Sequence, residues 1–179
     1  MAPPILSSVL LVRHADAKSR DRWDGADHLR PLTKRGVAQA QGLVAALAPW
    51  GIGRILTSPY VRCRQTVAPL ADSLGVAIAD DDALVEGQGA RAALELIRAF
   101  SAAAIGADRT GAGGATGGLV LCSHGDVIPD ILNALVHLDG IDLGPAPNCP
   151  KGCTWVLDPE PNGHGILRAT YVPPPVASS

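Results

Sequence analysis

Two arginines and two histidines stand in the sequence where their side chains can meet around a phosphate. Arg13 and His14 directly follow a short apolar run near the N-terminus. Arg62 and His124 come shortly after two later runs of the same kind. Arginine binds phosphate oxygens with a planar fork of donors and keeps its charge at any physiological pH. A neutral imidazole nitrogen can attack phosphorus and so split displacement by water into two steps. The four side chains therefore predict phosphoryl transfer without a metal ion.

Other polar residues nearby have competing structural interpretations. Ser58 can add a hydroxyl to a phosphate site or orient Arg62, but Ser58-Pro59 is equally typical of a helix N-cap followed by a first-turn proline. The run Asp80–Asp82 has neither the ligand spacing nor the histidine partner of a metal site, and we interpret it as a solvated acidic turn. We therefore expect no metal and no cofactor.

Apolar runs and helical periodicity give the elements that must position these residues. Runs at 9–12, 54–57, 76–79 and 119–122 predict buried strands, and patterns at 34–48, 60–74, 90–105 and 127–137 predict helices. A terminal hairpin is expected from 154–157 and 166–171. Pro69 is expected to kink or split the second helix. Such alternation predicts an α/β fold, a three-layer α/β/α sandwich around a mostly parallel sheet.

The predicted topology brings the chemistry to one edge of the sheet. Parallel strands have their carboxyl ends on the same side, and crevices there carry most sites of α/β proteins. Strands end at His14, at Ser58 and at His124, with Arg62 shortly after Ser58. We therefore expect these side chains to converge on one crevice.

Length and composition limit the number of domains, the classes of partner and the location of the protein. The 179 residues fit a single domain, 1–179, with a mobile loop at about 106–118 and a frayed tail at about 173–179. A net charge of −2 provides no whole-protein field for a nucleic acid polymer or an anionic membrane. The four cysteines form no C-x-x-C pair and are expected to be free thiols. With no signal peptide or membrane span expected, the predicted location is cytoplasmic.

Three segments resemble, in order, the defining motifs of the histidine phosphatase superfamily, which is phosphoglycerate mutase-like in fold. They are Leu11–Ala15, Thr57–Thr66 and Ser123–Gly125. The Arg-His-Ala variant and the segment Asp27–Gly36 are similar to the SixA-type phosphohistidine phosphatase branch. The later segments Val127–Asp130 and Lys151–Leu157 also resemble the phosphatase-like C-terminal domain of actinobacterial MutT-type Nudix hydrolases.

This resemblance implies a role for each matching residue. His14 is the implied nucleophile, and Arg13 and Arg62 are the implied phosphate clamps. His124 is implied as a second imidazole that donates to the phosphate. Many relatives supply a general acid from the loop after the third strand, where Glu86 stands.

The resemblance leaves the substrate open between two classes. A SixA-like enzyme would act on protein phosphohistidine, which we place first. A small phosphorylated metabolite or a nucleotide phosphate is the alternative. A non-catalytic phosphate-binding module is the rival from another class, but its decay should have damaged the four core residues, which are intact. Ala15, where the usual motif has glycine, is the one departure that can crowd the phosphate.

Overall fold

The computed structural model describes residues 7–110, 117–144, 149–161 and 164–176. Its strands are β1 (Val9–Arg13), β2 (Ile52–Thr57), β3 (Ile78–Asp80), β4 (Gly118–Ser123), β5 (Thr154–Pro159) and β6 (Ile166–Val172). They form a sheet in the order β3-β2-β4-β1-β5-β6. Strands β3, β2, β4 and β1 run parallel, whereas β5 pairs antiparallel with β1, and β6 pairs antiparallel with β5. The predicted mostly parallel sheet is confirmed.

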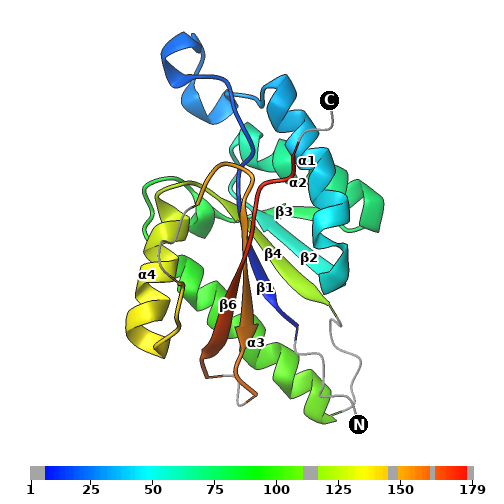
Figure 1. The fold of residues 1–179 in the computed structure, drawn as a ribbon, viewed down its shortest axis with the longest axis vertical. Coiled ribbons are helices and arrows are strands. Elements are labelled where there is room, and N and C mark those ends of the chain that lie inside the picture. The colour runs from blue at the N-terminus through cyan, green and yellow to red at the C-terminus, as the bar shows by residue number, and fades with distance from the viewer. Residues whose placement is uncertain (1–6, 111–116, 145–148, 162–163, 177–179) are drawn as a thin grey trace.

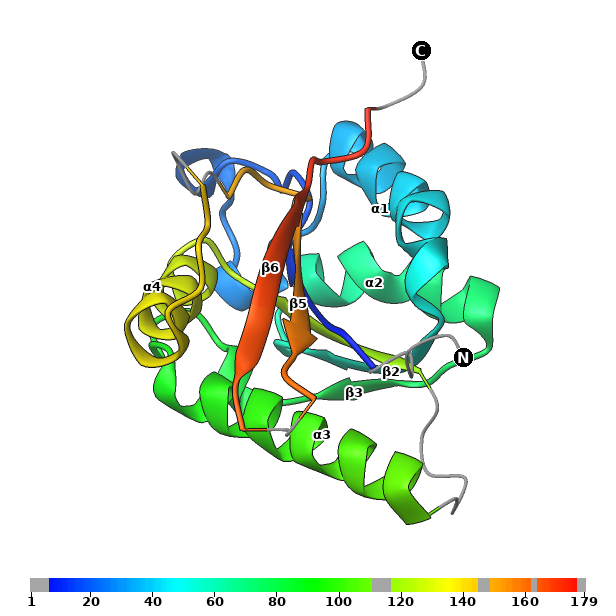
Figure 2. The same ribbon diagram turned by 60° about the horizontal axis from the view of Figure 1, so that its bottom comes forward.

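Four helices cover the sheet from both sides (Figures 1 and 2). They are α1 (Lys34–Leu47), α2 (Val61–Leu74), α3 (Arg91–Thr110) and α4 (Val127–Asp139). Short 3-10 turns lie at η1 (Arg20–Arg22), η2 (Asp27–Leu29), η3 (Ala48–Trp50) and η4 (Asp82–Leu84). Helices α1 and α2 cover one face, and α3 and α4 cover the other. This is the three-layer α/β/α arrangement expected from the sequence.

Side-chain alternation in β1 explains why the sheet needs both helical layers. Leu10 and Val12 pack in one core with residues of α1 and α2. Val9 and Leu11 pack in the other core with residues of α3 and α4. Successive side chains of a strand point to opposite faces, so a strand that is apolar throughout must be covered twice. The absence of alternation in this run is therefore what specifies a central strand.

The helix boundaries follow local signals, with some differences from the prediction. Thr33 Oγ1 accepts a hydrogen bond from the Gly36 N–H and caps α1. Pro69 lies inside α2 without dividing it. Ser58 does not cap α2, because the helix begins at Val61 and its N-cap, Tyr60, makes no side-chain capping bond. The N-cap interpretation of Ser58 was wrong.

The described parts of the expected loop and tail include helix and a contact with α1. Helix α3 continues to Thr110, five residues beyond the predicted end at 105, and β4 begins at Gly118. In the tail, a Cβ on Gly42 would collide with Pro175, so Pro175 lies against α1. Residues 111–116 and 177–179 lie outside the described residues. In the described part of the chain no helix is both long and apolar enough to cross a bilayer.

Candidate active site

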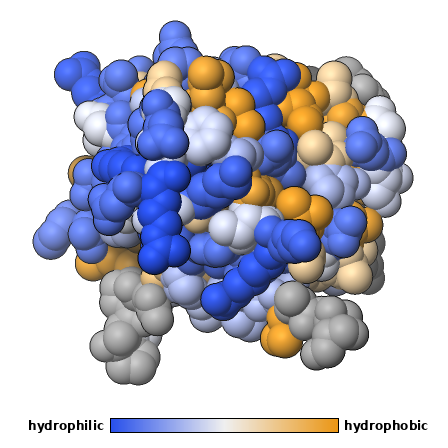
Figure 3. Space-filling model, turned by 90° about the horizontal axis from the view of Figure 1, so that it is seen from above, coloured by the Kyte–Doolittle hydropathy of each residue, from blue (hydrophilic) through white to orange (hydrophobic). Residues whose placement is uncertain are grey.

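The carboxyl ends of three neighbouring strands carry the predicted site residues. Backbone hydrogen bonds extend the pairing one residue past the strands: the His14 N–H donates to the Ser123 carbonyl, and the Ser58 N–H donates to the Cys122 carbonyl, each at 3.0 Å. The loop that follows β1 rises from this end of the sheet (Figure 1). Seen from above, the same end is covered largely by hydrophilic side chains (Figure 3). The predicted convergence of strand ends is therefore present.

His14 is buried with one ring nitrogen occupied. Its Nδ1 lies 2.8 Å from the carbonyl oxygen of Ala15, which can only accept, so Nδ1 carries the proton and Nε2 keeps its lone pair. Burial is the largest influence on the ring, and the charge of Arg62 adds to it; together they lower the pKa of His14 to about 3, although the Ala15 hydrogen bond opposes them. The imidazole is therefore neutral at physiological pH, as a nucleophile must be.

Arg62 is fully buried at the first turn of α2, and carboxylates surround its guanidinium. Its Nη1 donates to the Asp27 carbonyl at 2.9 Å and lies 3.1 Å from the Asp27 carboxylate. Its Nη2 donates to Glu86 at 2.9 Å. The guanidinium carbon lies 4.7 Å from the centroid of the Tyr60 ring, a stacking distance. Arg62 is thus a preorganised cation at the strand ends.

His124 lies beside both His14 and Arg62. The two imidazole centroids are 5.5 Å apart. Nδ1 of His124 lies 3.3 Å from Arg62 Nη2, and since a guanidinium can only donate, Nδ1 is the acceptor. The ring proton therefore sits on Nε2, which donates to Ser58 Oγ at 2.8 Å. To donate to a phosphate as expected, His124 must carry a proton on Nδ1. The phosphate must then take the place of Arg62 Nη2 beside that nitrogen.

Arg13 lies beneath the loop that carries His124. A Cβ on Gly125 would lie 2.5 Å from Arg13 Cζ, so only glycine lets the guanidinium occupy this place. Arg13 donates through Nη1 to the Cys149 carbonyl. Nε of Arg13 and Nε of Arg62 are buried and find no hydrogen-bond partner among the described residues. Buried donors without acceptors are uncommon, and two of them in one site suit an anion.

Glu86 lies at the same site, held by two arginines. Its carboxylate accepts from Arg62 Nη2 at 2.9 Å and from Arg20 Nη2 at 3.0 Å through both oxygens. The loop that carries Glu86 therefore lies beside Arg62, one of the two arginines that the resemblance implies as phosphate clamps.

Ser58 differs from its predicted contacts. Its hydroxyl accepts from His124 Nε2 and, at 3.4 Å, from the Tyr60 N–H. In this structure the fully buried Ser58 thus orients an imidazole rather than Arg62. Arg30 forms an ion pair with Asp27 at 2.9 Å.

Two residues at the site, Asp27 and Thr66, were not predicted as site residues from the sequence. Asp27 pairs with Arg62, Arg30 and Arg20. Burial favours its protonated form, but the Arg30 hydrogen bond and the nearby guanidinium charges outweigh burial and lower the pKa of Asp27 to about 2. Thr66 accepts from the Ala15 N–H at 2.9 Å and donates to the Arg62 carbonyl at 2.6 Å. Thr66 was quoted within a motif, and that was the available signal for it.

The cysteines are free thiols, as expected. Cys63 lies 3.5 Å from His124 Nε2, and burial raises the pKa of its thiol well above the usual value. Among the described residues, no group of three histidine, cysteine or acidic side chains could hold a metal ion.

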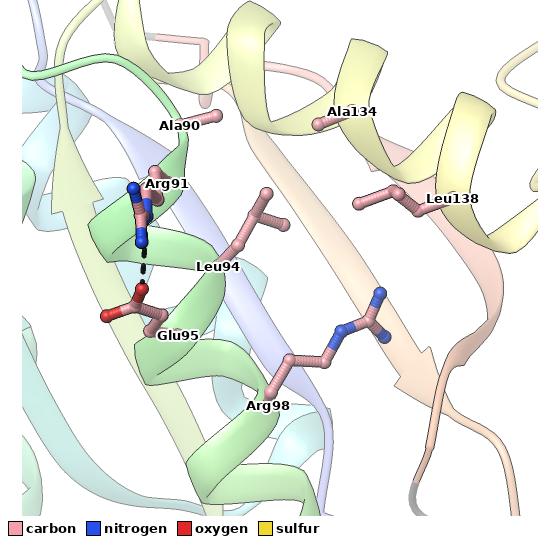
Figure 4. Close-up of a pocket in the computed structure, with 7 residues that line it drawn as sticks. All are labelled: Ala90, Arg91, Leu94, Glu95, Arg98, Ala134 and Leu138. Atoms are coloured by element: carbon pink, nitrogen blue, oxygen red, sulfur yellow. Dashed lines mark ion pairs between the residues drawn. The ribbon is translucent and has the colours of Figure 1, made fainter.

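A separate groove opens between α3 and α4 (Figure 4). Leu94 points into it from α3 and Leu138 from α4, while Arg91 and Glu95 pair at its rim. None of the residues that converge at the strand ends lines this groove. The residues predicted to bind phosphate therefore lie at the carboxyl ends of the strands and not in the apolar groove.

Comparison with known proteins agrees with this geometry. Residues 9–93 match the model of the histidine phosphatase superfamily (branch 1). An 8-oxo-(d)GTP phosphatase of Mycolicibacterium smegmatis is 34% identical over 176 residues, 97% of this chain. The chain spans 50% of the length of that curated relative.

Solved structures share the fold over nearly the whole chain. A protein from Agrobacterium tumefaciens assigned as the phosphohistidine phosphatase SixA has a TM-score of 0.68 and 23% identity, covering 94% of this chain and 99% of its own. A mycobacterial glucosyl-3-phosphoglycerate phosphatase has a TM-score of 0.59 and 19% identity, covering 92% and 97%. The family match over residues 9–93, the relative at 34% identity and the shared phosphoglycerate mutase-like fold agree with the three motifs: the chain is similar to members of the histidine phosphatase superfamily.

Proposed function

We propose that this chain is a phosphatase that passes a phosphoryl group from its substrate to Nε2 of His14 and then to water. The observation that carries the proposal is the hydrogen bond from His14 Nδ1 to the Ala15 carbonyl, beside Arg62 and His124. It fixes the tautomer in which Nε2 has a free lone pair, inside a site rich in guanidinium donors.

In the first step, the Nε2 lone pair forms a bond to phosphorus while the bond from phosphorus to the leaving group breaks. Arg13 and Arg62 bind the phosphoryl oxygens, and His124 stabilises the charge that spreads over them. A leaving oxygen that is a poor anion takes a proton from the protonated form of Glu86, which becomes the carboxylate. In the second step, water attacks phosphorus, gives its proton to the Glu86 carboxylate, and the N–P bond breaks. His14 is then free again.

Two substrate classes are supported by different observations. The SixA fold neighbours, of nearly the same length as this chain, support a phosphohistidine on a protein surface. The relative at 34% identity supports a nucleotide phosphate. The SixA neighbours share the fold at 23% and 17% identity, whereas the relative is 34% identical in sequence, so the relative is given more weight. A nucleotide phosphate is therefore the class to test first, with phosphohistidine second.

The test is a turnover panel with the purified chain. It includes nucleoside triphosphates and diphosphates with and without an 8-oxo base, a phosphohistidine peptide, sugar phosphates and 4-nitrophenyl phosphate, each with and without EDTA. We expect turnover of at least the activated ester, no loss with EDTA, and none in His14→Ala. Turnover by folded His14→Ala would overturn the nucleophile. Phosphate binding without turnover of any substrate would instead favour a non-catalytic module.

A further inference from the structure

Two hydrogen bonds tie the Glu86 loop, residues 84–87, to the loop that carries His124. Ser123 Oγ donates to the Leu84 carbonyl at 2.7 Å. The Gly87 N–H donates to Asp126 Oδ2, also at 2.7 Å. One bond lies two residues before Glu86, and the other lies one residue after it. The same two bonds also flank His124, one residue before it and two residues after it.

From this arrangement we propose that Ser123 and Asp126 are positioning residues for Glu86. They set the distance between the Glu86 backbone and the strand end at which His124 and the phosphate clamps stand. Gly87 has a φ of 86°, in the left-handed region that glycine adopts without strain. The loop can therefore turn sharply between its two hydrogen bonds to the His124 loop.

Ser123 and Asp126 differ in exposure and in their place in the fold. Ser123 is fully buried and belongs to β4. Asp126 is exposed and precedes α4, and its side chain does not cap the helix, so the acceptor it offers to Gly87 is not required by the helix itself. The Asp126 carboxylate thus accepts a hydrogen bond from the Glu86 loop and does not cap α4.

Positioning matters because proton transfer requires hydrogen-bond reach between the acid and the leaving oxygen. The side chain of Glu86 is held by Arg20 and Arg62, but these long side chains can follow the carboxylate if the loop shifts. The hydrogen bonds at Leu84 and Gly87 join the backbone of this loop to the loop that carries His124. A shift of about 1 Å in such a group can cost roughly a hundredfold in rate. This inference rests on the proposed function, in which Glu86 is the acid.

The experiment compares kcat/KM for phenyl phosphate, which has a poor leaving group, with that for 4-nitrophenyl phosphate, which has an activated one. We expect Asp126→Ala to lower the ratio of the two values by roughly ten- to hundredfold. Asp126→Asn keeps an amide oxygen that accepts from Gly87 and should retain the ratio. Asp130→Ala is the matched control, because Asp130 is an equally exposed aspartate one turn further along α4. A thermal melt of each variant checks the fold.

The outcomes separate this inference from the function beneath it. Lowered ratios in both Asp126→Ala and Glu86→Gln, with Asn and the control unchanged, support it. A lowered ratio in Glu86→Gln with an unchanged ratio in Asp126→Ala overturns the positioning role alone. An unchanged ratio in Glu86→Gln overturns the acid and the positioning role together, while His14→Ala reports independently on the nucleophile.

Discussion

Nδ1 of His14 donates to the carbonyl of Ala15 at 2.8 Å, so a backbone bond within the motif itself decides which ring nitrogen can react. The bond is made to the adjacent residue, so both partners lie in the same short segment of the motif. Burial beside two guanidiniums keeps the ring neutral. Both effects have consequences that can be measured.

The first consequence is a pH dependence of stability. The pKa of His14 is lowered from 6.5 to about 3, so between these values the unfolded chain binds a proton that the folded chain does not. The free energy of unfolding should therefore fall as pH falls from 6.5 towards 3, with a contribution from His14 of up to about 1.4 kcal/mol per pH unit. Urea unfolding of wild type and His14→Gln between pH 6.5 and 4.5 measures this contribution as a difference in slope. Parallel pH dependences would show that His14 titrates alike in both states.

Arg62→Lys should lower kcat/KM by roughly 10²- to 10³-fold, because a lysine ammonium cannot replace a fork that bonds several acceptors at once. The buried guanidinium donates to Asp27 and Glu86 and neighbours His124. Inhibition by inorganic phosphate should weaken in parallel. Arg64→Lys is the matched control, since Arg64 pairs with Asp80 at the surface two residues along. An equal loss in both variants would contradict a special role for Arg62.

Ser58→Ala removes the acceptor for His124 Nε2 and should lower kcat about tenfold, the effect expected from one lost hydrogen bond to a group that must hold its orientation. The KM should change little, because the hydroxyl makes no phosphate contact in this scheme. Ser101→Ala is a suitable control: Ser101 is buried, but its hydroxyl has no hydrogen-bond partner among the described residues. A rise in KM with kcat unchanged would return Ser58 to the phosphate-contact role.

Gly125→Ala places a methyl group 2.5 Å from Arg13 Cζ and must displace the guanidinium. We expect kcat/KM to fall about ten- to hundredfold, since a displaced clamp no longer meets the phosphoryl oxygens. Gly165→Ala serves as a control, because the nearest atoms to its Cβ among the described residues belong to the side chain of Glu160, at 3.3 Å. Wild-type kinetics in Gly125→Ala would show that Arg13 has no part in the reaction.

The sheet was predictable because apolar runs such as 9–12 and 119–122 leave few alternatives to buried parallel strands. The extension of α3 to Thr110 was not, since small residues and glycine in that stretch resemble loop composition. His14, Arg62 and His124 could be grouped because each follows a strand on the same edge, which is a rule of topology. The residues that form hydrogen bonds with these side chains follow no such rule of topology.

The ion pairs around Arg62 illustrate this limit. Asp27 lies 35 residues before Arg62, and Glu86 lies 24 residues after it. Ser58 and His124 are 66 residues apart. Contacts at such separations depend on how loops pack over the sheet edge, and no local pattern encodes that packing. The sequence therefore predicted which side chains gather, but not which of them hold one another.

The most direct test of the central claim is to trap the phosphorylated enzyme. Wild-type protein is quenched during turnover of 4-nitrophenyl phosphate, and the site of phosphorylation is located by mass spectrometry of peptides under conditions that preserve phosphohistidine. We predict one phosphoryl group on His14, and none at that position in untreated protein or in His14→Ala. A phosphoryl group on a different residue, or steady turnover in folded His14→Ala, would contradict the account.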